Sequence, residues 1–228
     1  MRPLRRLSCI ALLGLAAGAI PPFAAAAEPA APRDGEQYLT LPSRLPTDTG
    51  KRIEVIEFFA YYCPHCFAFE PALSAWVQKQ GDAIAFKRVH VPRGEPVLAQ
   101  QRLFYTLDAM GLLPQYHRKV FDAMHVDHLN LRTDQEVFDW VAKNGIDRAK
   151  FVDAYRSFGI QAKLNRASAM MEQYAVDRWP LIAIDGRWVT SPSHAGQGVA
   201  PGAGEAAQQQ AALQVMDYLV AKAKADQR

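Results

Sequence analysis

The chain has 228 residues, half of them hydrophobic, with 26 basic and 23 acidic side chains. This length and hydrophobic content are enough for one well-buried domain, or for one domain with a large insertion. Three of the basic residues lie in the first 27 positions, which leaves 23 of each sign, and no Lys/Arg-rich cluster follows. We therefore expect no nucleic-acid partner.

The first 27 residues have the layout of a secretory signal peptide. Three arginines precede an apolar run over 7–20, and small alanines continue to Ala27. The alternative is a retained membrane anchor, which the run disfavours because a spanning helix needs about 20 apolar residues. We predict a signal peptide at 1–27 and a mature, exported chain from 28 to 228.

The mature chain begins with a pattern of strand, helix and strand. A short strand-like segment covers 37–41, and the nearly continuous apolar run at 53–59 predicts a central strand that is covered on both faces. Helical spacing of apolar residues then predicts a helix that begins near Cys63. A second strand at 84–89 follows, and the connection predicts that the two strands are parallel.

A long helical segment is expected from about 96 to 176. Glycines stand at three positions where helix C-termini are expected: Gly111, Gly145 and Gly159. Thr133 and Glu136 have the spacing of a capping box at a helix start. Apolar side chains at helical spacing are its expected core: Phe104, Leu107, Val120, Phe121, Met124, Phe138, Val141, Phe151 and Tyr155.

The C-terminal part returns to strands and then to one helix. A hairpin is predicted over 181–190, with its turn at Asp185 and Gly186. Gly, Pro and Ser dominate 191–204, which indicates a loop. A closing amphipathic helix is expected over 205–224.

Cys63-Pro64-His65-Cys66 is the motif that carries chemistry. The third cysteine, Cys9, lies in the predicted signal peptide, so the mature chain keeps only this pair. Two cysteines with no other partner suit a disulfide that opens and closes better than one that staples a fold. We interpret the motif as a redox centre.

The position of the motif at a helix start favours thiolate chemistry at its first cysteine. Unpaired N–H groups and the helix dipole stabilise an anion there, and His65 adds a donor or a positive charge, so we expect the pKa of Cys63 to be lowered. Cys66 falls one turn later and is the expected buried, resolving thiol. Because a stabilised thiolate makes the disulfide easier to reduce, the Pro64-His65 dipeptide favours oxidation of other thiols.

Glu57 is the one further candidate in the active centre. It lies between Ile56 and Phe58 in the predicted central strand, where a carboxylate is poorly hydrated. If it lies beneath the motif, it can accept the proton of Cys66 or tune its release. The alternative is a glutamate on an edge strand in water.

A metal site is the other chemistry that a Cys-x-x-Cys pair suggests. A closed zinc site needs four ligands, and beyond the two cysteines the chain offers only scattered histidines. His125 and His128 have ligand-like spacing but equally suit a solvated helix end, and His90 at a strand end suits a structural role. We expect no metal, and no cofactor other than the Cys63–Cys66 disulfide.

Several motifs, in order along the chain, resemble the DsbA thiol:disulfide oxidoreductases of the bacterial periplasm: Glu57-Phe58-Phe59, Cys63-Pro64-His65-Cys66, Phe69-Glu70, Trp179-Pro180 and Asp185-Gly186-Arg187. The resemblance covers nearly the whole mature chain. It implies an α/β thioredoxin fold interrupted by a helical insertion at about 96–176. It further implies a cis Pro180 that faces the cysteines, where an extended substrate pairs with the backbone, and it places Glu57 and Glu70 at the family's acidic positions.

The family also implies the activity and the partners. The protein is expected to pass its disulfide to reduced, unfolded secreted proteins through a mixed disulfide at Cys63. A DsbB-type membrane protein would reoxidise it in the periplasm, and a monomer is expected. The alternatives are a disulfide isomerase or reductase of the same fold, or a non-catalytic periplasmic chaperone or metallochaperone.

Trp179 is a departure from the family, whose members usually carry a small β-branched residue before the cis proline. A large indole there would narrow or reshape the substrate groove, or stack on the substrate or on the sulfur pair. The alternative is an indole that turns outward and only covers the surface. Either way, the departure affects the choice of substrate and partner and leaves the redox chemistry intact.

Overall fold

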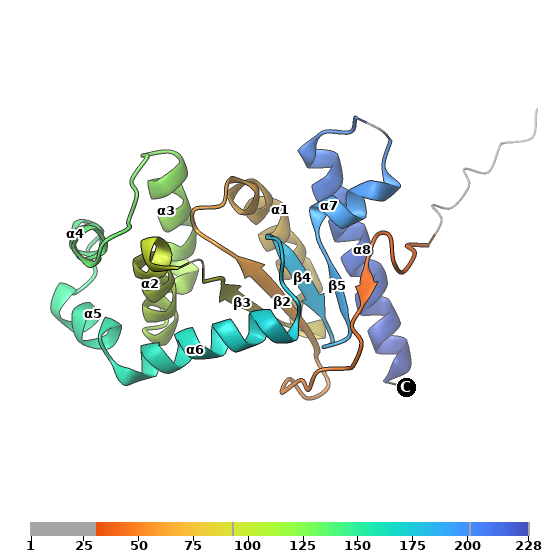
Figure 1. Cartoon of the computed structure of the whole chain (residues 1–228), viewed down its shortest axis with the longest axis horizontal. Helices are drawn as coiled ribbons and strands as arrows, with labels where there is room; N and C mark the ends of the chain where they lie inside the picture. Colours follow the sequence, from red (N-terminus) through yellow and green to blue (C-terminus); the bar gives the residue numbers. More distant parts are fainter. Residues whose placement is uncertain (1–30, 93, 201, 228) are drawn as a thin grey trace, which may run out of the picture. The chain divides into compact units, whose positions relative to one another are not determined.

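The computed structural model describes residues 31–92, 94–200 and 202–227 (Figure 1). The predicted signal peptide at 1–27 lies outside the described residues. The described chain contains a mixed five-stranded sheet in the order β1-β5-β4-β2-β3. Its strands are β1 (Leu39–Thr40), β2 (Ile53–Phe59), β3 (Ile84–His90), β4 (Leu181–Ile184) and β5 (Trp188–Thr190).

The helices of the described chain are α1 (Pro64–Gln80), α2 (Leu98–Ala109), α3 (Leu113–His125), α4 (Asp134–Lys143), α5 (Arg148–Tyr155), α6 (Phe158–Gln173), α7 (Pro192–Ala195) and α8 (Glu205–Asp226). Short 3₁₀ turns lie at Gly81–Ala83, Glu95–Val97 and Gly196–Gly198. Helices α2 to α6 follow one another between β3 and β4, which confirms the thioredoxin fold with a helical insertion (Figure 1). None of the helices in these described ranges is long and apolar enough to cross a membrane.

Strand β2 is the central element that positions the site. It pairs in parallel with β3 and antiparallel with β4, and all seven of its residues are buried, as its apolar sequence predicts. Successive side chains point to opposite faces of a strand. Ile53 and Val55 therefore pack with α1 and α8 in one core, whereas Ile56 and Phe58 join the core beneath the helical insertion.

Local signals explain several of the helix boundaries. Thr133 and Glu136 form both hydrogen bonds of the predicted capping box at the start of α4. Gly111 and Gly145 follow α2 and α4 with φ of 69° and 78°, a conformation that glycine adopts easily. Gly159 was expected at a helix C-terminus, and this is wrong, since it is the second residue of α6. The side chain of Ser157 caps that helix by accepting the Ile160 N–H.

The C-terminal region departs from the sequence prediction at one place. The hairpin of β4 and β5 is confirmed, and its turn residues Asp185 and Gly186 have φ of 54° and 61°, as a type I′ turn requires. The expected loop at 191–204 instead contains α7 and a 3₁₀ turn. Ser191 starts α7 by accepting the His194 N–H at 3.1 Å, and Pro192 has the fixed φ of a first helical residue.

Candidate active site

Cys63 is the N-cap residue of α1, at the junction between β2 and the helix. Its backbone is extended, with φ −84° and ψ 115°, and its sulfur accepts the Cys66 N–H at 3.3 Å. Pro64 takes the first helical position, where no N–H is needed. The sulfur of Cys63 thus lies at the positive end of the helix dipole and accepts the N-cap hydrogen bond that a side-chain oxygen usually accepts.

The two thiols have opposite environments. Hydrogen bonds from the Cys66 thiol and from nearby N–H groups, helped by the charge of His65, lower the pKa of Cys63 to about 7 against the effect of burial. Burial raises the pKa of Cys66 well above its ordinary value. Cys63 keeps 4% of its surface exposed and Cys66 keeps none. Of the two thiols, Cys63 is therefore the less buried and the one whose pKa favours the thiolate.

His65 lies on the surface and pairs with a residue far along the chain. Its Nδ1 is 2.8 Å from Oε1 of Glu205, in the first turn of α8. The hydrogen bond with Glu205 raises the pKa of His65, so the ring keeps its positive charge to higher pH. That charge contributes to the lowered pKa of Cys63. Glu205 carried no sequence signal.

The 179–180 peptide bond is cis, and it faces the motif. Sγ of Cys63 lies 3.7 Å from the carbonyl oxygen of Trp179. Pro180 is buried, while the Trp179 indole is half-buried and meets the Tyr62 ring edge-on, with centroids 6.3 Å apart. The indole therefore packs beside the motif and does not turn wholly into solvent.

Glu57 is buried in the middle of the sheet, with 1% of its surface exposed. Nε of Arg88 donates to its Oε2 at 2.9 Å, and within the described chain its Oε1 has no hydrogen-bond partner. Burial raises the pKa of Glu57 to about 7, although the charge of Arg88 opposes this. The alternative of a hydrated edge-strand glutamate is wrong, because β2 lies between β3 and β4.

Arg88 is the central residue that sequence reasoning missed. Besides Glu57 it binds Glu70, with Nη2 2.9 Å from each carboxylate oxygen, and Ser74 Oγ donates to Glu70 at 2.6 Å. Glu57 and Arg88 are direct partners in the parallel register of β2 and β3. Aligning the two predicted strands would therefore have placed this arginine beside the buried acid.

Two of the histidines considered as metal ligands, His125 and His90, have other contacts. Nε2 of His125 lies 2.7 Å from the Tyr61 carbonyl, and its ring stacks on Phe67 at 4.7 Å. His128 lies in the turn after α3. His90 is buried: its Nε2 accepts the Tyr61 N–H at 3.1 Å, and its pKa is lowered to about 3 by burial. No cluster of three possible ligands occurs in the described ranges.

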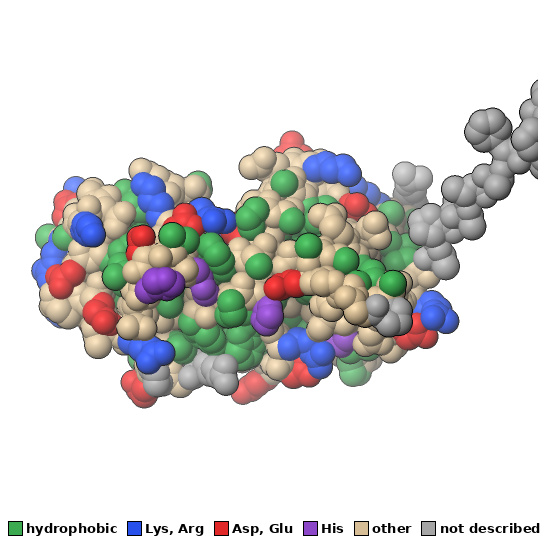
Figure 2. All heavy atoms as spheres, turned by 90° about the horizontal axis from the view of Figure 1, so that it is seen from above, with side chains coloured by type: hydrophobic (Ala, Val, Ile, Leu, Met, Phe, Trp, Pro, Cys, Tyr) green, Lys and Arg blue, Asp and Glu red, His purple; other side chains and the backbone are tan. Residues whose placement is uncertain are grey.

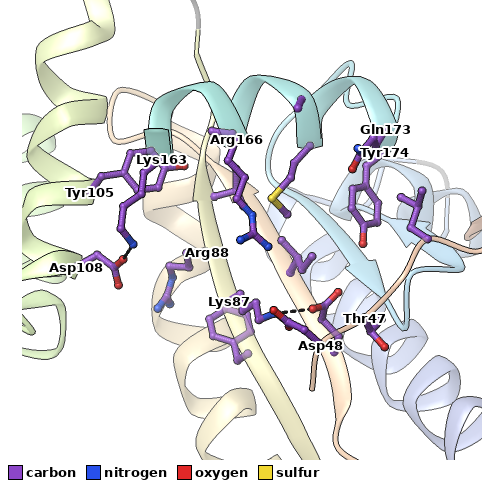
Figure 3. Close-up of a pocket in the computed structure, with 18 of the residues that line it drawn as sticks. Thr47, Asp48, Lys87, Arg88, Tyr105, Asp108, Lys163, Arg166, Gln173 and Tyr174 are labelled. Carbon is purple, nitrogen blue, oxygen red and sulfur yellow. Dashed lines mark hydrogen bonds and ion pairs between the residues drawn. The ribbon is translucent and has the colours of Figure 1, made fainter. Parts of the chain in front are cut away.

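Two hollows flank the sheet and the motif. The larger, of about 800 Å³, lies between α6 and strands β2 and β3, and no cysteine lines it (Figure 3). Its charges mostly pair with one another, since Lys163 binds Asp108 and Lys87 binds Asp48. We therefore do not assign the chemistry to it.

The smaller hollow, of about 560 Å³, adjoins the motif through Tyr62 and is lined mainly by the end of α3 and the turn after it. Two large apolar side chains of this turn, Val126 and Leu129, are exposed. The face drawn in Figure 2 carries hydrophobic side chains between its histidines. An apolar surface beside a reactive sulfur suits contact with an unfolded chain.

Known proteins of a single family are similar to this chain in both sequence and structure. A model of the DSBA-like thioredoxin domain matches residues 54–214. The chain is 38% identical to the thiol:disulfide interchange protein DsbA of Burkholderia cepacia over 209 residues, 91% of each protein, and 35% identical to that of Bordetella pertussis over 93% of this chain and 95% of the relative. The crystal structure of Pseudomonas aeruginosa DsbA superposes with a TM-score of 0.76 at 32% identity, covering 84% of this chain and 94% of that one.

Proposed function

This chain belongs to the DsbA family and is a thiol:disulfide oxidoreductase, and we propose that it oxidises reduced exported proteins by giving up its Cys63–Cys66 disulfide. One observation carries the proposal: the less buried cysteine of the pair is the one at the helix N-cap, and its pKa is lowered to about 7. Stabilising this thiolate stabilises the reduced enzyme, which makes the disulfide a stronger oxidant.

The exchange begins when a substrate thiolate attacks Sγ of Cys63. The Cys63–Cys66 bond breaks, its electron pair remains on Sγ of Cys66, and the substrate is held in a mixed disulfide with Cys63. A second substrate thiolate then attacks the substrate sulfur and releases Cys63 as a thiolate. The substrate has lost two electrons, and the enzyme disulfide has become a dithiol.

Glu57 supplies the proton that the thiol–disulfide exchange needs. The thiolate that leaves on Cys66 is buried, where a charge is costly, so it must be protonated as the bond breaks. A carboxyl group with a pKa of about 7 is protonated in a large share of molecules near neutral pH and can donate. The reverse transfer, from the Cys66 thiol to Glu57, serves reoxidation.

The loop at Trp179 and Pro180 holds the substrate. The cis proline presents the backbone of Trp179 to the reactive sulfur, so an extended peptide can pair with it edge-on. The Trp179 and Tyr62 rings form an aromatic wall beside that position. We assign the protein to the periplasm as a monomer that is reoxidised by a DsbB-type membrane partner.

The redox equilibrium of the mature protein with glutathione tests whether the protein acts as an oxidase or as a reductase. Thiol trapping of Cys63 and Cys66 should show a disulfide that dilute glutathione reduces easily. A disulfide that resists reduction would indicate a reductase or a structural bond instead.

A Cys66→Ala variant separates oxidation from passive binding. Incubated with an oxidised model peptide, it should accumulate a mixed disulfide at Cys63 that is not resolved, since the second sulfur is missing. If the variant keeps the full biological activity of the wild type, a chaperone is supported instead, because peptide binding alone does not need Cys66.

A further inference from the structure

His117 of α3 extends from the helical insertion toward the charged cluster of Glu57, Glu70 and Arg88 beside the motif. Its side chain is buried, with 6% of the residue exposed, among the rings of Phe59, Tyr61 and Phe121, with centroids 5.1–5.3 Å away. Its Nδ1 lies 3.0 Å from Oη of Tyr61, and its Nε2 lies 3.5 Å from Oε2 of Glu70. Nε2 is buried and makes no hydrogen bond within the described chain, so the contact with Glu70 is a close approach longer than an ordinary hydrogen bond.

These two contacts define the tautomer of the ring. An ionised carboxylate only accepts hydrogen bonds, so the nitrogen that faces Glu70 must carry the hydrogen. Nδ1 is then the acceptor, and the Tyr61 hydroxyl donates to it. Burial lowers the pKa of His117, which keeps this neutral form at neutral pH. The ring therefore directs one N–H at Glu70.

Glu70 and Glu57 share a single guanidinium unequally. Glu70 accepts hydrogen bonds from Arg88 Nη2 at both oxygens and from the Ser74 hydroxyl, and its Oε2 lies 3.5 Å from His117 Nε2, whereas Glu57 accepts only from Arg88 Nε. Burial would raise the pKa of Glu70, but His117 and Arg88 outweigh it and hold that pKa at about 2. Two buried carboxylates beside one cation leave a proton on the acid with fewer donors.

We propose that His117 is a positioning residue of the thiol exchange: its Nε2–H fixes Glu70 as the carboxylate bound by Arg88, and so leaves the proton of the pair on Glu57. The inference rests on the proposed role of Glu57 as proton donor to Cys66. The titratable and charged groups around this cluster are Glu57 of β2, Tyr61 after it, Cys63, Cys66 and Glu70 at α1, and Arg88 and His90 of β3.

The test is a titration of both carboxyl groups by carbon NMR in the reduced, glutamate-labelled protein, with Glu57→Gln and Glu70→Gln for assignment. In His117→Leu the pKa of Glu57 should fall and that of Glu70 should rise, each by about 1 unit, because the bias between the two acids is lost. His117→Gln keeps a donor toward Glu70 and should restore most of the difference. Opposite shifts of two neighbouring carboxyls are not expected from a purely structural change.

Phe121→Leu is the matched control for packing. It removes a ring 5.1 Å from the imidazole but leaves both polar contacts of His117 in place, so neither carboxyl should move. If His117→Leu does not fold, Tyr61→Phe deletes only the hydroxyl that donates to Nδ1 of His117 and should shift the pKa values of both carboxyls in the same directions by less. Unmoved carboxyls in the folded variant overturn the inference.

The oxidised, disulfide form of the wild type, assayed separately, distinguishes failure of the inference from failure of the proposed function. Wild-type protein that oxidises a dithiol peptide supports the function whatever the titration shows. If the wild-type protein fails to oxidise the peptide, the proposed function is contradicted. A proton on Glu57 would then have no role in thiol exchange.

Discussion

The lowered pKa of Cys63 should stabilise the reduced protein, relative to a variant that lacks this thiol, as the pH rises from 5 to 8. Replacing Cys63 with serine isolates this effect, because serine caps a helix equally well and does not ionise in this range. The shift runs from an ordinary 9.0 to about 7. At pH 8 a folded pKa two units below the unfolded one contributes about 1.4 kcal/mol, and at pH 5 it contributes almost nothing.

The free energy of unfolding increases with pH because the pKa of Cys63 is lower in the folded protein than in the unfolded chain. The stabilisation is complete above the unfolded value of 9.0 and is lost as the pH falls through about 7. Cys66 adds little at pH 8, because its pKa is raised and its thiol stays protonated in the folded state. Groups distant from the motif occur in both proteins and cancel in the comparison, whereas the pKa values of Glu57 and His65 also respond to the charge of Cys63.

The assay is urea unfolding of reduced wild type and reduced Cys63→Ser at pH 5 and pH 8. We expect the free energy of unfolding of the wild type, relative to the variant, to increase by about 1.4 kcal/mol between the two pH values. A difference that stays flat, or that falls with pH, refutes the reasoning that the helix N-cap stabilises the thiolate.

Three further changes test other contacts of the site and fold. Glu57→Gln should slow glutathione reduction of the disulfide about 100-fold below pH 7 by removing the proton donor, and only slight slowing in stopped-flow rates contradicts this role. Glu205→Gln should move the NMR titration of His65 toward lower pH, because the hydrogen bond that raises its pKa is lost, whereas an unmoved titration means that the pair does not form. Thr133→Ala should reduce the free energy of unfolding by about 1 kcal/mol in urea, since it removes the capping box of α4, and an unchanged midpoint argues against that cap.

Much of this protein could be predicted because its signals are local. The apolar run of β2, the motif at the start of α1 and the Asp185-Gly186 turn each depend on residues close in sequence, and each is found where it was expected. Local patterns failed where two of them competed. Gly159 resembled a helix end, but the Ser157 side chain two residues earlier starts a helix there.

The sequence by itself determined which sulfur lies at a helix N-terminus and that an acid lies in the strand before it. Only the tertiary structure decided how that acid is ionised, because its neighbours are distant in the chain: Arg88 lies 31 residues beyond Glu57. His117 lies 56 residues beyond Tyr61, and Glu205 lies 140 beyond His65. Proton affinity depends on burial and on charges a few ångströms away in space, and packing of the sheet against two sets of helices sets both.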